Sequence, residues 1–196
     1  TPWEVSGEID YTKLIQQFGT QRLTDDLKER IARHAGFMHM QLRRDVFFSH
    51  RDLDLWLKEY EEGRPVGLYT GRGPSGSVHL GHLLPWFFCK YLQDAFGAHL
   101  YFQMTDDEKF LLRDELTLEQ TISYTYENAL DVVACGLRPD LTHIFSDTEN
   151  IAHIYKLGLK VSKRITFSTV KAVFGFTDSD NIGLTWYPAL QAMTCF

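Results

Sequence analysis

Two histidines separated by two residues, His79 and His82, could both donate hydrogen bonds to the oxygens of one phosphate chain. We expect them on the first turns of a helix, where residues three apart lie on the same face. Gly81 between them would leave room for a flat group, such as a ribose or a purine, to lie on the helix. The competing interpretation, surface polar residues near a helix start, is the usual one for an isolated pair of this spacing. The context of the pair decides between the two.

The residues that flank the histidines predict a strand, a turn and a helix. Val66 to Thr70 is expected to form a short buried strand, and apolar residues recur at helical spacing from Leu83 to Leu92, ahead of Gly97. Ser75 or Ser77 is expected to cap this helix. The turn between strand and helix is rich in residues that are free to adopt positive φ, namely Gly71, Gly73 and Gly76.

Such a turn is suited to binding a nucleotide. A helix N-terminus offers unpaired N–H groups and the positive end of a dipole, and glycines let a phosphate approach the backbone closely. No Gly-Lys-Ser/Thr sequence follows, so this is not a Walker loop, and Gly71-Arg72-Gly73 lacks the third glycine of the dinucleotide fingerprint. We therefore predict a nucleotide site of another kind, with the two histidines facing the phosphates.

A second predicted strand brings polar side chains to the same end of the sheet. His99 to Thr105 is an apolar stretch with one amide, Gln103, close to its end. Strand, helix and strand at this spacing predict a right-handed parallel crossover, with ligands beyond the carboxyl ends of the strands. Gln103 and the segment from Thr105 to Lys109 would then lie at the site, beside Tyr69 from the first strand. Spacing alone favours a core hydrogen bond between Tyr69 and Gln103 over a substrate-binding role.

The remaining pattern predicts an α/β fold with a doubly wound parallel sheet, preceded by a small, mostly helical N-terminal segment. We divide the chain into an N-terminal extension, residues 1–63, and the first part of a nucleotide-binding domain, residues 64–196. Trp3 and Val5 alternate in a short piece that we expect to be extended or a hairpin. Further expected elements are helices from Thr24 to Gly36, Ser49 to Gly63 and Thr117 to Gly136, one or two helices between Ile151 and Gly175, a strand from Thr142 to Ser146, and a last helix containing Gln191.

Composition narrows the class of protein. With 196 residues, 44% of them hydrophobic, the chain can bury a substantial core. A formal net charge of -6 argues against a generally basic surface that coats nucleic acid. The cysteines are odd in number and widely spaced, so we expect reduced, buried thiols in a cytosol-like compartment. They are Cys89, Cys135 and Cys195. No apolar run approaches the length of a membrane span, so we expect a soluble, cytoplasmic protein without a membrane partner.

Three segments together resemble a known enzyme family. His79-Leu80-Gly81-His82 is similar to the HIGH motif of class I aminoacyl-tRNA synthetases, and Tyr69-Thr70-Gly71-Arg72-Gly73-Pro74-Ser75 resembles the eukaryotic cytosolic type of tryptophanyl-tRNA synthetase. The segments Gln103 to Lys109 and Phe174 to Asp180 also resemble that family and follow in the same order, so the resemblance covers nearly the whole chain. It implies that tryptophan is activated by ATP, which brings Mg²⁺ with it, and is then transferred to tRNA(Trp) by a homodimeric enzyme.

The resemblance also implies roles for individual residues. His79 and His82 would stabilise charge on the phosphate oxygens, and Arg72 and Lys109 would assist them. The residues expected to line the nucleotide, besides these histidines and Arg72, are Thr70, Gly71, Gly73 and Gly81. The residues expected to hold tryptophan are Tyr69 and Gln103 at the indole N–H, and Glu108 and Gln191 at the ammonium group. We assign no protein ligand to a metal, and for Asp178-Ser179-Asp180 we prefer an Asx turn ahead of a strand to a metal site.

One stretch resembles a second synthetase motif but does not fit its position. Lys160-Val161-Ser162-Lys163-Arg164 is similar to KMSKS, which in the family follows the residues that match Gln191. Here it precedes them in a segment with helical periodicity, so we interpret its charges as a solvated helix face. We expect the true loop, and the region that contacts most of the tRNA, to lie beyond Phe196.

Two alternatives to a tryptophanyl enzyme stay open at this point. A tyrosyl-tRNA synthetase shares the architecture, and Gln103 argues against it. A catalytically inactive synthetase fragment that acts as a binding module is the other alternative, because these 196 residues alone are expected to be incomplete for aminoacylation.

Overall fold

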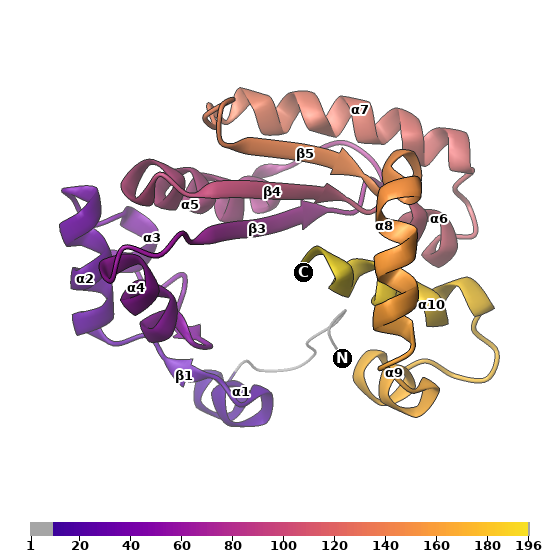
Figure 1. The fold of residues 1–196 in the computed structure, drawn as a ribbon, viewed down its shortest axis with the longest axis horizontal. Coiled ribbons are helices and arrows are strands. Elements are labelled where there is room, and N and C mark those ends of the chain that lie inside the picture. The colour runs from indigo at the N-terminus through magenta and orange to yellow at the C-terminus, as the bar shows by residue number, and fades with distance from the viewer. Residues whose placement is uncertain (1–9, 196) are drawn as a thin grey trace.

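The computed structural model describes residues 10–195 of the chain (Figure 1). The short extended piece expected around Trp3 and Val5 lies outside the described residues. The elements are helices α1 (Tyr11–Phe18), α2 (Asp25–Ala35), α3 (Met40–Arg43), α4 (Leu53–Glu61), α5 (Leu80–Phe96), α6 (Asp106–Leu112), α7 (Leu118–Ala134), α8 (Asp147–Ser162), α9 (Phe167–Phe174) and α10 (Ile182–Ala192), strands β1 (Gln21–Arg22), β2 (Ser49–His50), β3 (Gly67–Arg72), β4 (His99–Met104) and β5 (Thr142–Ser146), and a final 3₁₀ turn (Met193–Cys195).

The main sheet is parallel and has the strand order β3-β4-β5. Helix α5 connects β3 to β4, and α7 lies between β4 and β5 in the sequence, so two crossovers in the same direction put both helices on one face of the sheet. A buried cluster on this face joins Trp86 of α5, Phe102 of β4 and Val132 of α7. This arrangement confirms the predicted α/β class with a parallel sheet.

Helices α6, α8 and α10 lie at the carboxyl ends of the strands (Figure 1). Helix α10 packs against both α8 and α6, although it is distant from α6 in the sequence. Helix α8 follows directly from β5. The Ser146 hydroxyl caps α8 by accepting a hydrogen bond from the N–H of Glu149. The last residues of β4 and β5 are buried, including Gln103, Met104 and Ser146, whereas the end of β3 is partly open to solvent.

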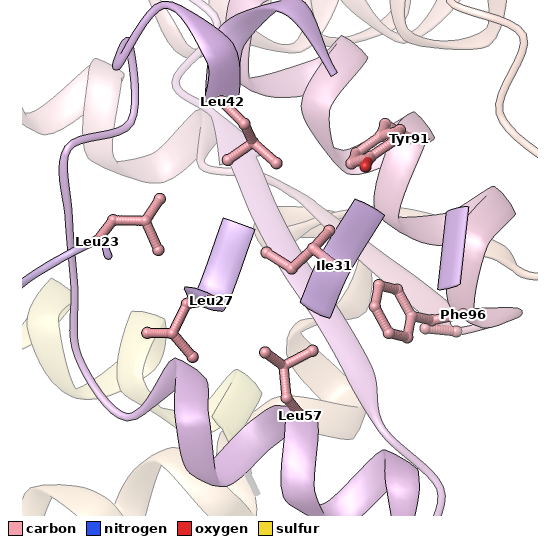
Figure 2. Packing of buried hydrophobic residues seen from close by; sticks show 8 residues of the cluster. Leu23, Leu27, Ile31, Leu42, Leu57, Tyr91 and Phe96 are labelled. Atoms are coloured by element: carbon pink, nitrogen blue, oxygen red, sulfur yellow. The ribbon is translucent and has the colours of Figure 1, made fainter. Parts of the chain in front are cut away.

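The N-terminal helices are anchored to the sheet layer through the second half of α5. Leu27, Ile31 and Leu57, from α2 and α4, pack with Tyr91 and Phe96 of α5 in one buried cluster (Figure 2). Burying an aliphatic side chain of this size contributes about 1.5–3 kcal/mol. The cluster thus makes the N-terminal extension part of the same folded body as α5.

Several predicted starts of helices differ from the structure. Helix α5 begins at Leu80 with His79 as its N-cap, not at Ser75 or Ser77, because the His79 ring takes the role of the capping hydroxyl. Ser49 lies in strand β2, and α4 starts after Asp52, which adopts φ 58°. Asp52 is the N-cap of α4 but makes no side-chain capping bond, and the His50 ring accepts from the N–H of Leu53 instead.

Other elements differ in extent. Helix α1 and helix α6 were not expected, and α8 begins at Asp147 rather than at Ile151. The region from Ile151 to Gly175 contains two helices, within the range predicted. After Asp178-Ser179-Asp180 the chain enters helix α10, capped by Asn181, and not a strand.

The structure also bears on the predictions for the cysteines, for a membrane span and for the segment that resembles KMSKS. Cys89 and Cys135 are free and half-buried, rather than both fully buried, and Cys195 has no described side chain. Within residues 10–195, no helix combines the length and the apolar character needed to cross a bilayer. Lys160 is exposed near the end of α8, which confirms the helical, solvated interpretation of the segment that resembles KMSKS.

Candidate active site

A cavity of about 440 Å³ opens at the carboxyl ends of β3 and β4. It brings together residues from the first strand, the segment after β4 and the two last helices, which are far apart in the sequence. The lining residues are Tyr69, Thr70, Gly71, Arg72, Gly73, Thr105, Glu108, Phe174, Tyr187 and Gln191. Seven of the residues predicted for the site are in this set, whereas Phe174 and Tyr187 were not predicted as site residues.

The floor of the cavity carries a chain of short hydrogen bonds. The Tyr69 hydroxyl donates to Gln103 Oε1 at 2.6 Å, and Gln103 Nε2 donates to Asp147 Oδ1 at 2.6 Å. Gln103 has no exposed surface and lies behind Tyr69, which is itself half-exposed to the cavity. Because Tyr69 gives its proton to Gln103, the Tyr69 oxygen keeps lone pairs that can accept a hydrogen bond from a ligand.

A buried carboxylate stands across the cavity from this tyrosine. Glu108 is 5% exposed, accepts a 2.6 Å hydrogen bond from the Thr105 hydroxyl, and pairs with Lys109 Nζ at 3.0 Å. The lysine and the hydroxyl together satisfy a charge that would be costly to bury alone. Glu108 and the amide of Gln191, on α10, line the same cavity and can both accept from a bound ammonium group.

The glycines of the turn are required by close approach more than by positive φ. Of the three expected to adopt positive φ, only Gly76 does, at 152°. A Cβ at Gly71 would lie 2.6 Å from the carbonyl oxygen of Gln103, and a Cβ at Gly73 would lie 2.0 Å from Lys109 Cε. The prediction of special φ at Gly71 and Gly73 was therefore wrong, and the strand extends through Arg72 instead.

Arg72 is held by a residue that the sequence analysis missed. Its Nε donates to Asn128 Oδ1 at 3.1 Å, and Asn128 Nδ2 donates to the carbonyl of Gly76 at 3.1 Å. Burial lowers the pKa of Arg72, with the Glu108 charge acting in the opposite direction. Asn128 was detectable in principle, because polar residues repeat at helical spacing along one buried face of α7: Thr121, Thr125 and Asn128.

The two histidines form a stacked capping pair. His79 Nδ1 accepts from the N–H of Gly81 at 3.2 Å, and His82 Nδ1 accepts from the N–H of His79 at 3.1 Å. Their ring centroids are 3.7 Å apart. An Nδ1 that accepts must be the unprotonated nitrogen of a neutral ring, so each ring presents Nε2–H as a donor. The pair can therefore donate two hydrogen bonds from the start of one helix.

Two details differ from the expected arrangement. Gly81 makes room for the His79 ring, since a Cβ there would lie 3.0 Å from His79 Cε1, and whether a ribose or purine lies on it stays a prediction. The pKa of His82 is lowered by burial first and then by the charges of Arg72 and His79, which favours the neutral ring. Neither histidine nor Gly81 lines the cavity that contains Tyr69.

The acidic segment near the end of the chain is occupied by protein contacts. Asp178 pairs with Lys171 at 2.5 Å, and Asp180 Oδ2 accepts from the N–H of Thr177 at 2.6 Å. The side chain of Asp180 therefore reaches back to Thr177, which is not the Asx turn expected. Among residues 10–195, no three His, Cys, Asp or Glu side chains gather in a way that could hold a metal ion.

Comparison with known proteins identifies the family. A family model described as class I tRNA synthetases (W and Y) matches residues 61–195. The chain belongs to this family. The match begins at the end of α4 and includes the strand, the glycine turn and the capping histidines described above.

Two curated relatives of this class I synthetase are archaeal enzymes. A tryptophan–tRNA ligase of Saccharolobus solfataricus is 56% identical over 97% of the chain and 50% of the relative. One from Pyrococcus furiosus is 52% identical over 100% of the chain and 51% of the relative. The chain therefore spans about half the length of the curated relatives it matches.

Solved structures confirm the predicted class I catalytic fold. A Plasmodium falciparum tryptophanyl-tRNA synthetase aligns with a TM-score of 0.91 and 45% identity. The alignment covers 96% of this chain and 52% of the Plasmodium chain. A tryptophanyl-tRNA synthetase from Encephalitozoon cuniculi, solved bound to tryptophan, aligns with a TM-score of 0.91 and 44% identity, covering 95% of the chain and 56% of that structure.

Proposed function

We propose that this chain is the first half of the catalytic part of a tryptophan–tRNA ligase. Such an enzyme joins tryptophan to ATP, forming tryptophanyl-adenylate and pyrophosphate, and then transfers the amino acid to tRNA(Trp). The observation that carries the proposal is the Tyr69 hydroxyl, which donates to the buried Gln103 and offers an oxygen acceptor to the cavity. The names of the relatives, all tryptophan enzymes, support the same substrate.

Indole selection follows from that acceptor. In this proposal the Tyr69 oxygen accepts the indole N–H, and Gln103 keeps the tyrosine proton turned away from the ligand. Phenylalanine would leave the acceptor unpaired, at a cost of about 1–3 kcal/mol. Tyrosine would bring a hydroxyl group in place of the indole N–H. The ammonium group of tryptophan is assigned to Glu108 and Gln191, which line the same cavity.

The activation step needs positioning and charge stabilisation more than covalent chemistry. The tryptophan carboxylate attacks the α-phosphorus of ATP in line with the departing pyrophosphate. We assign His79 and His82 to the developing phosphate charge, because each presents Nε2–H at a helix start. Arg72 and Lys109 supply positive charge beside them. Thr70, Gly71, Gly73 and Gly81 complete the proposed nucleotide site in the backbone around β3 and α5.

Several properties of the whole protein belong to the proposal. Mg²⁺ would enter as the ATP complex, and we assign it no protein ligand. We propose a cytoplasmic homodimer that contacts tRNA(Trp) mainly outside these residues. We keep the division into an extension, 1–63, and a catalytic part, 64–196, which is supported by a family match that begins at residue 61. The eukaryotic cytosolic type stays part of the proposal: the Plasmodium falciparum structure is 45% identical to the chain, and the two archaeal ligases are 56% and 52% identical.

The test is ATP–pyrophosphate exchange by the full-length protein, with tryptophan, tyrosine and phenylalanine supplied in turn. We expect strong stimulation by tryptophan and little by the other two amino acids. Equal stimulation by tyrosine would contradict the assignment of Tyr69 and Gln103 to indole selection. Absence of exchange with every amino acid would instead indicate a binding module.

A further inference from the structure

Behind Gln103 lies a buried acid that the reaction described above does not use. Asp147, the first residue of α8, is 1% exposed, and its Oδ1 accepts the 2.6 Å hydrogen bond from Gln103 Nε2. Its other oxygen, Oδ2, is buried, and no donor among the described residues reaches it. A buried carboxylate oxygen without a donor is costly, so the second oxygen of Asp147 requires an explanation.

A second carboxyl group, Asp107 of α6, is close enough to Asp147 for the two side chains to interact directly. Asp147 is buried and Asp107 is half-buried, so ionising both carboxyl groups at once is unfavourable, and one proton shared between them would give the unpaired oxygen a partner. Burial and then the Asp107 charge raise the pKa of Asp147 to about 8, and burial raises that of Asp107 as well.

The surrounding charged groups also favour the protonated form of the pair. Two neighbouring acids on α6 act in the same direction, because the Asp106 charge raises the pKa of both Asp147 and Asp107, and the Glu108 charge raises that of Asp107. Two cations lie in this region: Lys109 pairs with Glu108, and Arg72 donates to Asn128.

We propose that Asp147 is a positioning residue for tryptophan selection, acting as a neutral acid whose Oδ2–H donates to Asp107 while its Oδ1 fixes the amide of Gln103. The proposal rests on the proposed function, because it assigns the origin of indole selectivity at the same site. Asp147 contacts no ligand in it and acts through Gln103 and Tyr69.

In this proposal, selection of the indole N–H depends on the orientation of the Gln103 amide. A glutamine amide can turn over, exchanging its oxygen and nitrogen. In the reversed orientation, Gln103 Nε2 would donate to the Tyr69 oxygen. The tyrosine O–H would then point into the cavity, where it would meet the indole N–H donor to donor. When the proton of Asp147 lies on the side of Asp107, Asp147 Oδ1 can only accept a hydrogen bond. It therefore pairs with the amide nitrogen of Gln103 and not with the amide oxygen. This fixes the orientation in which Gln103 Oε1 faces Tyr69.

The experiment compares tryptophan with an analogue whose indole N–H is replaced by sulfur, benzothienylalanine, in pyrophosphate exchange by the full-length protein. The readout is the ratio of the kcat/KM values for the two substrates, which a general loss of stability would not change. Asp147→Ala removes the acceptor and should lower the ratio about tenfold. Asp147→Asn mimics the neutral acid, with its carbonyl toward Gln103 and its amide toward Asp107, and should keep the ratio within about threefold of the parent.

Asp106→Ala is the matched control. Asp106 is equally buried on α6 and accepts from the N–H of Thr148 at 3.2 Å, but it is not bonded to Gln103. We expect this variant to reduce both kcat/KM values together and to leave their ratio unchanged. If Asp147→Ala does not fold, Asp147→Ser, which also lacks the carbonyl, takes its place.

The outcomes separate the two levels of the proposal. A retained ratio in Asp147→Asn with a collapsed ratio in Asp147→Ala supports the neutral positioning acid. A ratio that collapses in both variants would mean that an ionised Asp147 is needed, and a ratio retained in both would mean that Asp147 does not orient Gln103. Either result overturns this inference while leaving tryptophan activation intact. A parent protein without tryptophan-dependent exchange overturns the proposed function itself.

Discussion

Replacing Asn128 by alanine should weaken both the fold and the proposed nucleotide site. The side chain has no exposed surface and bridges Arg72 Nε to the Gly76 carbonyl through two 3.1 Å hydrogen bonds. A hydrogen bond to a charged group is worth about 1.5–3 kcal/mol and a neutral one about 1 kcal/mol. Because Arg72 is half-buried, water can replace part of the first bond, so we expect a loss near the lower end of the sum, about 2.5 kcal/mol.

Urea unfolding of the full-length protein, followed by circular dichroism, measures this loss. Thr125→Ala is the control on the same helix, because the Thr125 hydroxyl bonds only to the carbonyl of Thr121 within α7, and its loss should cost about 1 kcal/mol or less. Asn128→Ala should also raise the KM for ATP, since Arg72 lines the cavity. An Asn128→Ala variant no less stable than Thr125→Ala would refute the reasoning that Asn128 holds the turn in place.

Three further changes test other parts of the structure. His82→Ala should lower the rate of tryptophan activation about 100-fold while leaving the KM for tryptophan nearly unchanged, as measured by pyrophosphate exchange, because the group is assigned to transition-state charge. Gly71→Ala should raise the KM for tryptophan and reduce stability to urea, since its Cβ would meet the Gln103 carbonyl oxygen at 2.6 Å, whereas Gly67→Ala on the same strand has 3.8 Å to its nearest neighbour and should be tolerated. Burial raises the pKa of Cys89 to about 11, so at pH 8 only about one thiol in a thousand is ionised, and alkylation by iodoacetamide, read by peptide mapping, should be slow in the native protein and rapid in urea.

The parts of the fold that could be predicted are those with a local, repeating signal. The apolar runs of β3, β4 and β5 and the 3.6-residue period of α5 and α7 come from burial of one face, which a single sequence displays directly. The start of α7 at Thr117 was predicted as well, and the structure adds a capping box with Gln120 that the sequence analysis did not identify.

The parts that could not be predicted depend on contacts between distant segments. His79 displaced the two serines as a cap because its ring can also stack on His82, an interaction that no capping preference includes. Asn128 lies 56 residues from Arg72, and only the packing of α7 against the sheet layer brings them together. Asp147 is likewise 44 residues from Gln103, so the sequence indicated the amide but not the acid behind it.

The capping histidines limit how this protein can be engineered for heat resistance. Aspartate, asparagine and serine are the preferred N-caps, so a design that optimises helix starts would replace His79 by aspartate. That change would strengthen the helix and at the same time remove an Nε2–H donor and add a negative charge at the proposed phosphate site. The start of α5 is therefore a position where a gain in melting temperature would be a loss of turnover, and stabilising substitutions are better directed at the N-terminal cluster shown in Figure 2.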